Sequence, residues 1–421
     1  MEMIPEKQVP KDRLNLIYWC IYYVGLVILL PWNILITVNG YWDYKFRNLN
    51  ATLEDTGPTQ IQKEFTAYLS IAANVPNAIF VILHALIGHW FSMRLRIFGS
   101  QVGQIVVFLF IVILSILDTD DWQRLFMILN LLIIALINTF SAIFQGSASA
   151  NVGKFPVPYI GNMVSGAGMG GLLPALVNVI ILAVEADFQV AGFYCFLIAE
   201  IMAILCLVVS VYIERTPFYA FYSTNETLVP QINPKRDVRI YKEVMRDSWI
   251  YILVNLINFT TTLAVFPGIM VLVEPADSDL DTLWAKTFFV PVLCFVLYNL
   301  SDVLGKQLAV WLQWPSVSKW NQVILLGAAI VRIALIPLIM FCNVSPSLRR
   351  SEVAFQSDVV YGILNAILGI SNGYVGNLAM MFGPKVVKPE HQEVTSAFLI
   401  AALVIGCGIG SVLSVPLVKA L

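Results

Sequence analysis

Charged residues are scarce in this sequence, and their scarcity excludes a water-soluble globular protein. They make up only 12% of its 421 residues, whereas about a quarter of an average soluble domain is charged. Hydrophobic residues make up 58% of the chain, and the mean hydropathy is +0.79. We therefore expect an all-α polytopic membrane protein that has the lipid bilayer as its main partner.

Clustered basic residues and metal-ligand motifs are also missing. The formal net charge is −2, which argues against a nucleic-acid partner, because phosphate contacts need clustered Lys and Arg. The three histidines are scattered, and the six cysteines form no CxxC motif or other cluster, so we expect no disulfide bond, metal or cofactor. Without a sizeable soluble domain, a Ser/His/Asp constellation or an HExxH motif, an enzyme or a receptor is the weaker class of function.

Eleven apolar stretches are long enough to cross a membrane, which takes about 20 residues each. They begin near positions 14, 66, 95, 125, 159, 188, 248, 287, 322, 358 and 394. The first is too long for the core of a signal peptide and lacks a small-residue cleavage site. We therefore expect it to be retained as the first transmembrane helix.

The connections between the spans predict an orientation and a division of the chain. Lys and Arg in the connections number 15 on the side of the N-terminus and 8 on the opposite side. By the positive-inside rule, the N-terminus is expected in the cytoplasm and the C-terminus outside. We predict an N-terminal bundle (1–213, helices 1–6), a cytoplasmic loop (214–247) and a C-terminal bundle (248–421, helices 7–11). Such a pair of bundles is typical of alternating-access transporters, which bind substrate between the bundles at mid-membrane.

Asp302 and Lys306 are charged residues inside an otherwise apolar span. Their spacing of four places them on one face of a helix, with the acid before the base, and Asn299 shares that face. Charges inside a membrane are costly and usually face a bundle interior or a water-filled cavity. The pattern indicates either a polar transport site or a structural pair that locks two helices together, and the residues alone leave both open.

Two further spans offer candidate binding residues. Trp32 follows Pro31 in the first span, where a proline kink would present a stacking face, although Trp in membrane proteins is also a common interfacial anchor. Gln145 belongs to a polar stripe of the fourth span with Asn138, Ser141 and Ser149. Its amide can donate and accept hydrogen bonds at once, which suits a nucleobase edge or a sugar hydroxyl. Packing between helices is the alternative for this stripe.

Glycines in two spans predict close helix packing. Residues 165–171 (SGAGMGG) match the letters of a GxGxxG motif, but no strand precedes them and no βαβ unit surrounds them, which argues against a dinucleotide site. Gly166 with Gly170 forms a small-xxx-small pair instead, and Gly406 with Gly410 repeats it in the last span.

Asn50 begins an Asn-x-Thr glycosylation motif in a long outer connection, where we expect a glycan. Asn225 carries the same motif on the side expected to be cytoplasmic. Asn343 is expected too close to the membrane to be a good acceptor.

Several motifs together resemble the equilibrative nucleoside transporter family over nearly the whole chain. They are LPWN at 30–33, FQGS at 144–147, DVLG at 302–305 with WP at 314–315, SNGY at 371–374 and FGPK at 382–385. The resemblance implies eleven helices in a 6+5 major-facilitator-like arrangement. It also implies facilitative, sodium-independent transport of purine and pyrimidine nucleosides of the adenosine, inosine and uridine class.

The resemblance also assigns residues and shows one departure. Trp32 and Gln145 match family residues that line the ligand site, and Asp302 and Lys306 match the acid and base of the D-x-x-G-R motif. The family usually has Arg where Lys306 stands, so affinity or substrate preference is expected to differ. A nucleobase carrier or a proton-coupled nucleoside carrier is the nearest alternative, because Asp302 or Glu200 could titrate if desolvated. We expect the plasma membrane, with a lysosomal or other endomembrane as the alternative, and the oligomeric state stays open.

Overall fold

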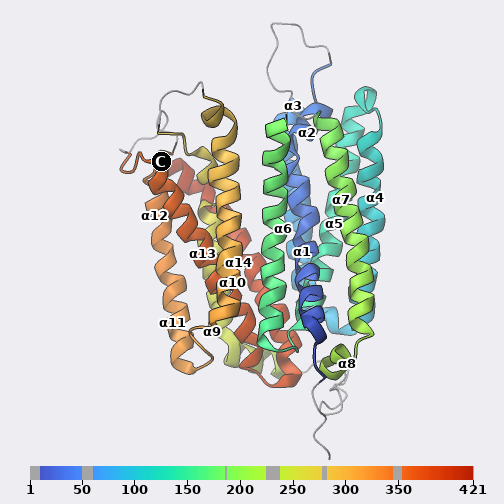
Figure 1. The fold of residues 1–421 in the computed structure, drawn as a ribbon, viewed down its shortest axis with the longest axis vertical. Coiled ribbons are helices and arrows are strands. Elements are labelled where there is room, and N and C mark those ends of the chain that lie inside the picture. The colour runs from blue at the N-terminus through green and yellow to red at the C-terminus, as the bar shows by residue number, and fades with distance from the viewer. Residues whose placement is uncertain are drawn as a thin grey trace, which may run out of the picture.

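The computed structural model describes residues 10–49, 60–184, 187–223, 238–276, 282–344 and 353–420. The long helices run roughly parallel in two groups, which we call the first half (α1 to α7) and the second half (α9 to α14) (Figure 1). The lower end of the bundle is the end where α1 begins and α8 lies, at the bottom of Figure 1. The opposite end is the upper end.

The helices follow one another in the order expected from the apolar spans. The first half contains α1 (Leu16–Thr37), α2 (Asn39–Lys45), α3 (Gln60–Ile87), α4 (Ser100–Ile116), α5 (Gln123–Val152), α6 (Val157–Val184) and α7 (Phe188–Glu214), and α8 (Pro217–Ser223) follows it. The second half contains α9 (Val238–Val265), α10 (Leu297–Leu312), α11 (Lys319–Val331), α12 (Leu335–Met340), α13 (Asp358–Phe382) and α14 (Gln392–Ala420). Short π-helical segments lead into α4 (Leu95–Gly99) and α10 (Val290–Val296), and a 3₁₀ turn (Arg332–Ala334) joins α11 to α12.

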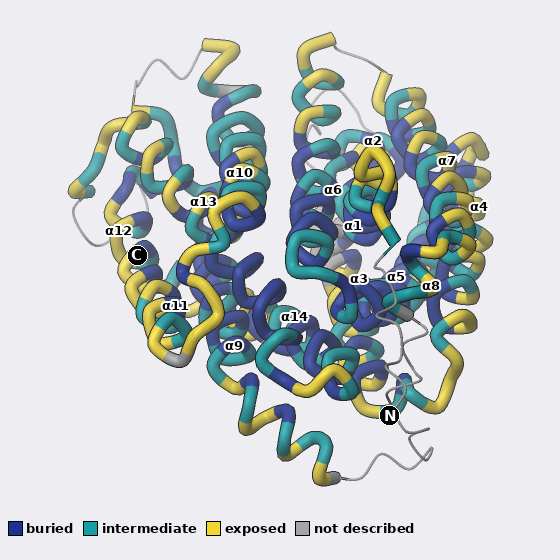
Figure 2. Tube along the Cα trace, turned by 60° about the horizontal axis from the view of Figure 1, so that its bottom comes forward, coloured by how far each residue is buried: buried dark blue, intermediate teal, exposed yellow. Residues whose placement is uncertain are grey.

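Eleven helical segments of the described residues are long and apolar enough to cross a membrane. The prediction of an all-helical membrane protein with eleven spans is confirmed. Large apolar side chains such as Leu132, Ile198 and Val208 are exposed, whereas the polar Asn258 and Asn365 are buried. Figure 2 shows exposed residues on the outer faces of α4 and α7. Apolar residues outside and polar residues inside are the reverse of the arrangement in a soluble protein. This arrangement suits a lipid environment, because lipid tails cannot form hydrogen bonds with polar side chains.

The predicted glycine contacts are confirmed. α1 packs along α6, and α9 packs along α14. A methyl group on Gly166 would overlap the backbone oxygen of Tyr22 on α1, and one on Gly410 would lie 2.5 Å from the backbone oxygen of Thr260 on α9. The absence of side chains therefore lets these helix backbones touch, which maximises van der Waals contact where lipid gives no hydrophobic driving force.

The segment expected as a cytoplasmic loop is partly helical. It contains α8, and α9 begins at Val238, whereas the apolar pattern places the start of that span near Ser248. The added turns of α9 are rich in charged residues, so hydropathy does not detect them. The Phe218 ring of α8 packs against the rings of Phe155 and Tyr159, with centroids 5.9 and 5.1 Å apart. These aromatic contacts attach α8 to the lower end of the first half.

Candidate functional site

Asp302 and Lys306 form a buried ion pair on α10. Lys306 Nζ lies 2.6 Å from Asp302 Oδ2, and the lysine and aspartate side chains are 10% and 8% exposed. Their expected pairing on one helix face is confirmed. Each charge alone would be costly inside a membrane, so the contact between them offsets part of that cost.

The second oxygen of Asp302 is held from α13. Asn372 Nδ2 donates to Asp302 Oδ1 over 2.7 Å. The two helices come this close because glycines lie at their crossing. A methyl group on Gly305 would overlap the backbone oxygen of Ile370, and one on Gly373 would overlap that of Asp302. Backbone contact between α10 and α13 therefore brings the Asn372 amide within hydrogen-bond distance of Asp302.

Asn372 connects the ion pair to a larger buried network. Its Oδ1 accepts from Asn258 Nδ2 at 3.0 Å and from Thr262 Oγ1 at 2.9 Å, both on α9. The guanidinium of Arg332 donates in turn to Asn258, to Thr262 and to Ser371. The network so defined holds two cations and one carboxylate.

Part of this site faces α6 of the first half, which packs against both α10 and α13. A methyl group on Gly168 would lie 3.1 Å from Lys306 Nζ. One on Gly171 would lie 2.6 Å from Asn299 Oδ1 and 4.0 Å from Asn33 Nδ2 of α1. Asn299 and Lys306 thus lie at the boundary between the halves.

Trp32 and Gln145 are both half-buried in the first half. Trp32 packs against the hydrophobic core. Among the residues that the structure describes, neither side chain makes a hydrogen bond, so none joins them to Asp302 or Lys306. Their roles in binding remain predictions.

Two members of the polar stripe on α5 bond within the first half. Ser141 Oγ accepts from Gln104 Nε2 of α4 at 3.1 Å. Asn138 Nδ2 donates to the backbone oxygen of Ile134, one turn earlier, at 2.9 Å. For Ser141 the packing of helices is therefore the better interpretation, Asn138 bonds within its own helix, and Gln145 stays the candidate for ligand contact.

Ionic contacts join the halves at the lower end. Glu393, at the start of α14, lies 2.9 Å from Arg96 Nη2 and 3.6 Å from Lys154 Nζ, and both basic residues belong to the first half. His84 Nε2 lies 3.0 Å from both Arg96 Nη1 and Ser147 Oγ. Because a guanidinium only donates, this ring nitrogen accepts, which assigns the neutral form to His84.

A lysine from the second half adds contacts to the backbone of the first. Lys385 Nζ donates to the carbonyl oxygens of Gly153 and Phe155, at the lower end of α5. Ser396 of α14 fills the space beside Gly153, where an added methyl group would overlap its hydroxyl. We call Arg96, Lys154, Lys385 and Glu393 the lower latch. They hold the two halves together at the lower end.

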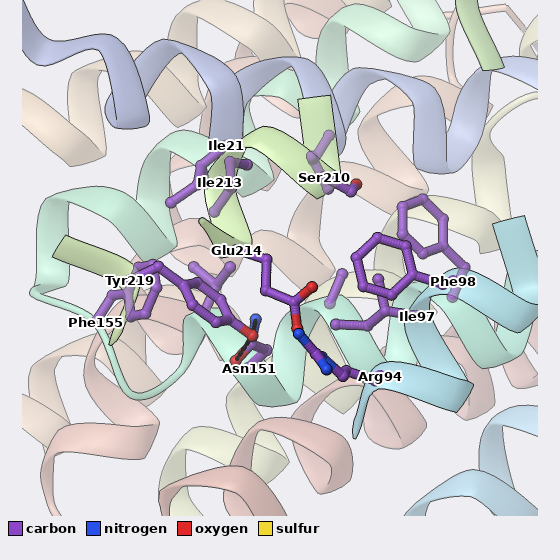
Figure 3. A pocket seen from close by; sticks show the side chains of 14 residues that line it. Ile21, Arg94, Ile97, Phe98, Asn151, Phe155, Ser210, Ile213, Glu214 and Tyr219 are labelled. Carbon is purple, nitrogen blue, oxygen red and sulfur yellow. Dashed lines mark hydrogen bonds and ion pairs between the residues drawn. The ribbon is translucent and has the colours of Figure 1, made fainter. Parts of the chain in front are cut away.

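A separate pocket lies inside the lower end of the first half (Figure 3). Its empty volume, with the open mouth included, is about 520 Å³. Asn151 Nδ2 donates to the hydroxyl of Tyr219 over 3.3 Å in its wall, and Arg94 pairs with Glu214 there. The hydrogen bond and charge of Glu214 raise the pKa of Arg94 above its ordinary value. None of the five expected binding residues lines this pocket, so it is distinct from the candidate site.

A family model described as a nucleoside transporter matches residues 131–253 and 231–419, well over half of the chain. The chain belongs to this nucleoside transporter family. Equilibrative nucleoside transporter 3 of Rattus norvegicus is 28% identical, over 97% of this chain and 90% of the relative. Equilibrative nucleoside transporter 1 of Homo sapiens is 26% identical, over 96% of this chain and 97% of the relative.

Solved structures of other transporters share the fold of this member of the nucleoside transporter family. The proton:xylose symporter XylE superposes with a TM-score of 0.62 at 11% identity, over 94% of this chain and 86% of XylE. FucP, in its outward conformation, superposes with a TM-score of 0.58 at 9% identity, over 96% and 95% of the two chains. Both are major facilitator superfamily proteins, so the expected major-facilitator-like arrangement is confirmed.

Part of the polar network of this nucleoside transporter family member carries no motif in the sequence. Asn372 belongs to the SNGY motif at 371–374 and Arg332 is a charged residue inside an apolar span, but Asn258 and Thr262 belong to no motif. Asn258 and Thr262 are four residues apart on α9 and fully buried, so they share one face of that helix. A search for polar residues at that spacing in every span would have found them. No group of three or more His, Cys, Asp or Glu in the described ranges is arranged to hold a metal ion.

Proposed function

We propose that this protein is a facilitative carrier of purine and pyrimidine nucleosides that works by alternating access. The observation that carries the proposal is the buried Asp302–Lys306 pair at the boundary between the two halves. Carriers of this architecture bind substrate at mid-membrane between their halves. Membership of the nucleoside transporter family and near full-length similarity to equilibrative nucleoside transporters support the choice of substrate.

Five residues are assigned roles in this proposal. Asp302 and Lys306 engage ribose hydroxyls, with Asn299 beside them. Trp32 stacks on the base and Gln145 bonds its edge. A neutral polar solute suits a mostly apolar cavity that has a few well-placed polar groups.

The lower latch supplies the gating contact of the same proposal. In this structure its ion pairs and backbone hydrogen bonds join the two halves at the lower end, and release of substrate at that end requires them to break. The excess of Lys and Arg in the connections supports a cytoplasmic lower end, with the N-terminus on the same side. We propose the plasma membrane as its location, which fluorescence microscopy of a tagged chain tests against lysosomal markers.

Uptake by purified protein in proteoliposomes tests the proposal directly. We expect saturable uptake of radiolabelled uridine and adenosine that is unchanged by sodium or proton gradients. Empty liposomes are the control. Saturable uptake of free nucleobases with no uptake of nucleosides would assign the protein to the alternative class of substrate.

Glu200 gives a specific reason to include the proton gradient. This residue of α7 is 4% exposed, and its Oε2 has no hydrogen-bond partner among the described residues. Acidic residues inside membrane spans often belong to proton pathways in transporters. Uptake that an inward proton gradient drives above equilibrium, and that Glu200→Gln makes insensitive to the gradient, would establish the proton-coupled alternative.

Exchange of Lys306 for arginine tests the contact with substrate. If Lys306 only neutralises Asp302, either base serves. In our proposal it contacts ribose, so Lys306→Arg should shift the half-saturating concentration of adenosine, inosine or uridine about fivefold, the equivalent of ~1 kcal/mol for one hydrogen bond. Lys388→Arg, an exposed lysine outside the site, is the matched control. Saturation curves of wild type and Lys306→Arg that superimpose for all three nucleosides would assign the pair to structure.

Neutralising the latch carboxylate should open the lower end. Glu393→Gln removes the charge that Arg96 and Lys154 share, and ~1 kcal/mol lost from the closed state raises the open population about fivefold. A cysteine at Ser149, one turn above Gly153 on α5, reports opening through its rate of labelling by a water-soluble thiol reagent. Glu390→Gln, three residues away, is the control. Equal labelling rates in the Glu393→Gln and Glu390→Gln backgrounds would remove Glu393 from the latch.

A further inference from the structure

Arg332 is a fully buried guanidinium whose donors are all directed at second-half atoms. Its Nε donates to Ser371 Oγ at 2.8 Å, and its Nη1 donates to both the backbone oxygen and Oδ1 of Asn258. Its Nη2 donates to Thr262 Oγ1 at 2.8 Å and to the backbone oxygen of Leu368 at 3.2 Å. Arg332 is 4% exposed, and none of these partners is a carboxylate. Arg332 donates to five neutral acceptors and makes no hydrogen bond to Asp302 or Lys306. Burying a cation without a carboxylate partner is costly, so this arrangement needs a functional reason.

The hydrogen bonds that begin at Arg332 run in one direction. A guanidinium can only donate, so Asn258 Oδ1 must accept, and this turns Asn258 Nδ2 toward Asn372 Oδ1, 3.0 Å away. Thr262 likewise accepts from Arg332, and its hydroxyl proton is left for the oxygens of Asn258 and Asn372. The side-chain oxygen of Asn372 therefore accepts hydrogen bonds, and its NH₂ group is available to donate one.

The chain of donors ends on the carboxylate of the candidate site. Asn372 Nδ2 donates to Asp302 Oδ1 at 2.7 Å, while Lys306 occupies Oδ2 at 2.6 Å. A carboxylate can only accept, so both ends of the chain have fixed polarity. With a donor-only group at one end and an acceptor-only group at the other, the amides between them have one favourable orientation. If the Asn372 amide were reversed, its oxygen would face Asp302 Oδ1, and the two acceptors would repel each other. Asp302 would then lose the hydrogen bond that fixes its Oδ1.

We propose that Arg332 is a positioning residue for Asp302, acting through Asn258, Thr262 and Asn372, which we call the amide relay. The inference rests on the proposed function, because Asp302 is placed there as a ribose-binding group. Arg332 itself does not touch substrate. It fixes the orientation of the relay, and the relay fixes the carboxylate oxygen that is not paired with Lys306.

Two substitutions at Arg332 separate this role from simple packing. Arg332→Lys keeps a group that only donates, whereas Arg332→Gln introduces a carbonyl oxygen that can accept and so removes the fixed polarity. We expect Arg332→Gln to raise the half-saturating concentration of adenosine about tenfold. A change of that size lies within the range of coupling energies measured between interacting residues. The maximal rate of uptake per reconstituted molecule should change little. Arg332→Lys should stay within about threefold of wild type.

The matched control is Asn365→Ala, two turns earlier on α13. Asn365 is a buried amide like Asn372, but it donates to the backbone oxygens of Leu293 and Cys294 and lies outside the relay. We expect it to leave the half-saturating concentration of adenosine within about twofold of wild type. If Arg332→Gln does not fold, Thr262→Val replaces it, because it removes one relay hydroxyl at nearly constant shape, with a threefold effect expected.

A double-mutant cycle with Asp302→Asn gives the decisive readout. Arg332 and Asp302 make no hydrogen bond to each other, but their charges interact, so the cycle is repeated with Thr262→Val, which changes no charge. A relay makes both Arg332→Gln and Thr262→Val nearly silent once the carboxylate is gone, whereas independent residues would give additive effects. Additive effects, or equal effects of Arg332→Gln and Arg332→Lys, would overturn the relay while wild-type uptake still supports the carrier. Wild-type vesicles that take up no nucleoside would refute the proposed function itself, and the positioning role with it.

Discussion

Asp302→Ala is expected to abolish nucleoside uptake and to lower the thermal stability of the purified protein. The substitution leaves Lys306 and Arg332 buried in the network with no carboxylate between them. Removing one partner of a buried ion pair typically costs about 3 to 5 kcal/mol, because the remaining charge is desolvated without compensation. Uptake should fall below about a hundredth of the wild-type rate, which a loss of that size allows. Melting curves and uptake at matched protein amounts measure the two effects.

Two companion variants show which part of the loss is electrostatic. Asp302→Asn keeps an oxygen that accepts from Lys306, so it should be less damaging than alanine. The double variant Asp302→Ala/Lys306→Met also removes the lysine that Asp302→Ala leaves without a partner. It should recover part of the stability but none of the transport. Ser301→Ala, the adjacent buried position, is the control for mutation of this helix turn. Normal transport by Asp302→Ala and Asp302→Asn would exclude the pair as both ligand site and gate.

The sequence predicts the helical framework well because each span carries its own signal. A stretch of apolar residues longer than 20 is detected without knowledge of its neighbours, and eleven such spans are found. The small-xxx-small pairs likewise predict close packing, although not which helix is the partner. The early start of α9 at Val238 escapes detection because its first turns are polar and lie beyond the apolar stretch.

The candidate site is predicted only where its residues share one helix. The spacing of four between Asp302 and Lys306 is enough to predict their contact, because it fixes a common face. The other hydrogen-bond partner of Asp302, Asn372, lies on α13, and the rest of the network comes from α9 and the turn after α11. No spacing rule relates Arg332 to Asn258 or Asn372, since their proximity depends on how three helices cross. The lower latch escapes prediction for the same reason, since Arg96 and Glu393 are far apart in the chain.

The crossing of α10 and α13 makes Gly373→Ala the second substitution with a large expected effect. A methyl group at Gly373 would overlap the backbone oxygen of Asp302 and lie 2.7 Å from the backbone nitrogen of Lys306. Backbone atoms cannot rotate away as a side chain can, so the helices must separate. Overpacking of this kind costs about 1 to 3 kcal/mol, and the separation also withdraws Asn372 from Asp302. We expect a lower melting temperature and a loss of nucleoside uptake larger than the loss of stability alone would give.

Gly362→Ala is the matched control on the same helix. It separates the effect of the backbone contact at Gly373 from the general effect of replacing a glycine. A methyl group there would meet Leu297 Cδ2 at 3.7 Å, which is an ordinary van der Waals contact. Because alanine favours a helix over glycine by about 1 kcal/mol, Gly362→Ala should keep or raise the melting temperature and leave uptake unchanged. The contrast between the two variants then reports the backbone contact at Asp302 and not glycine content in general. If Gly373→Ala matched Gly362→Ala in both measurements, the close approach of α10 and α13 would not be what holds Asp302 in place.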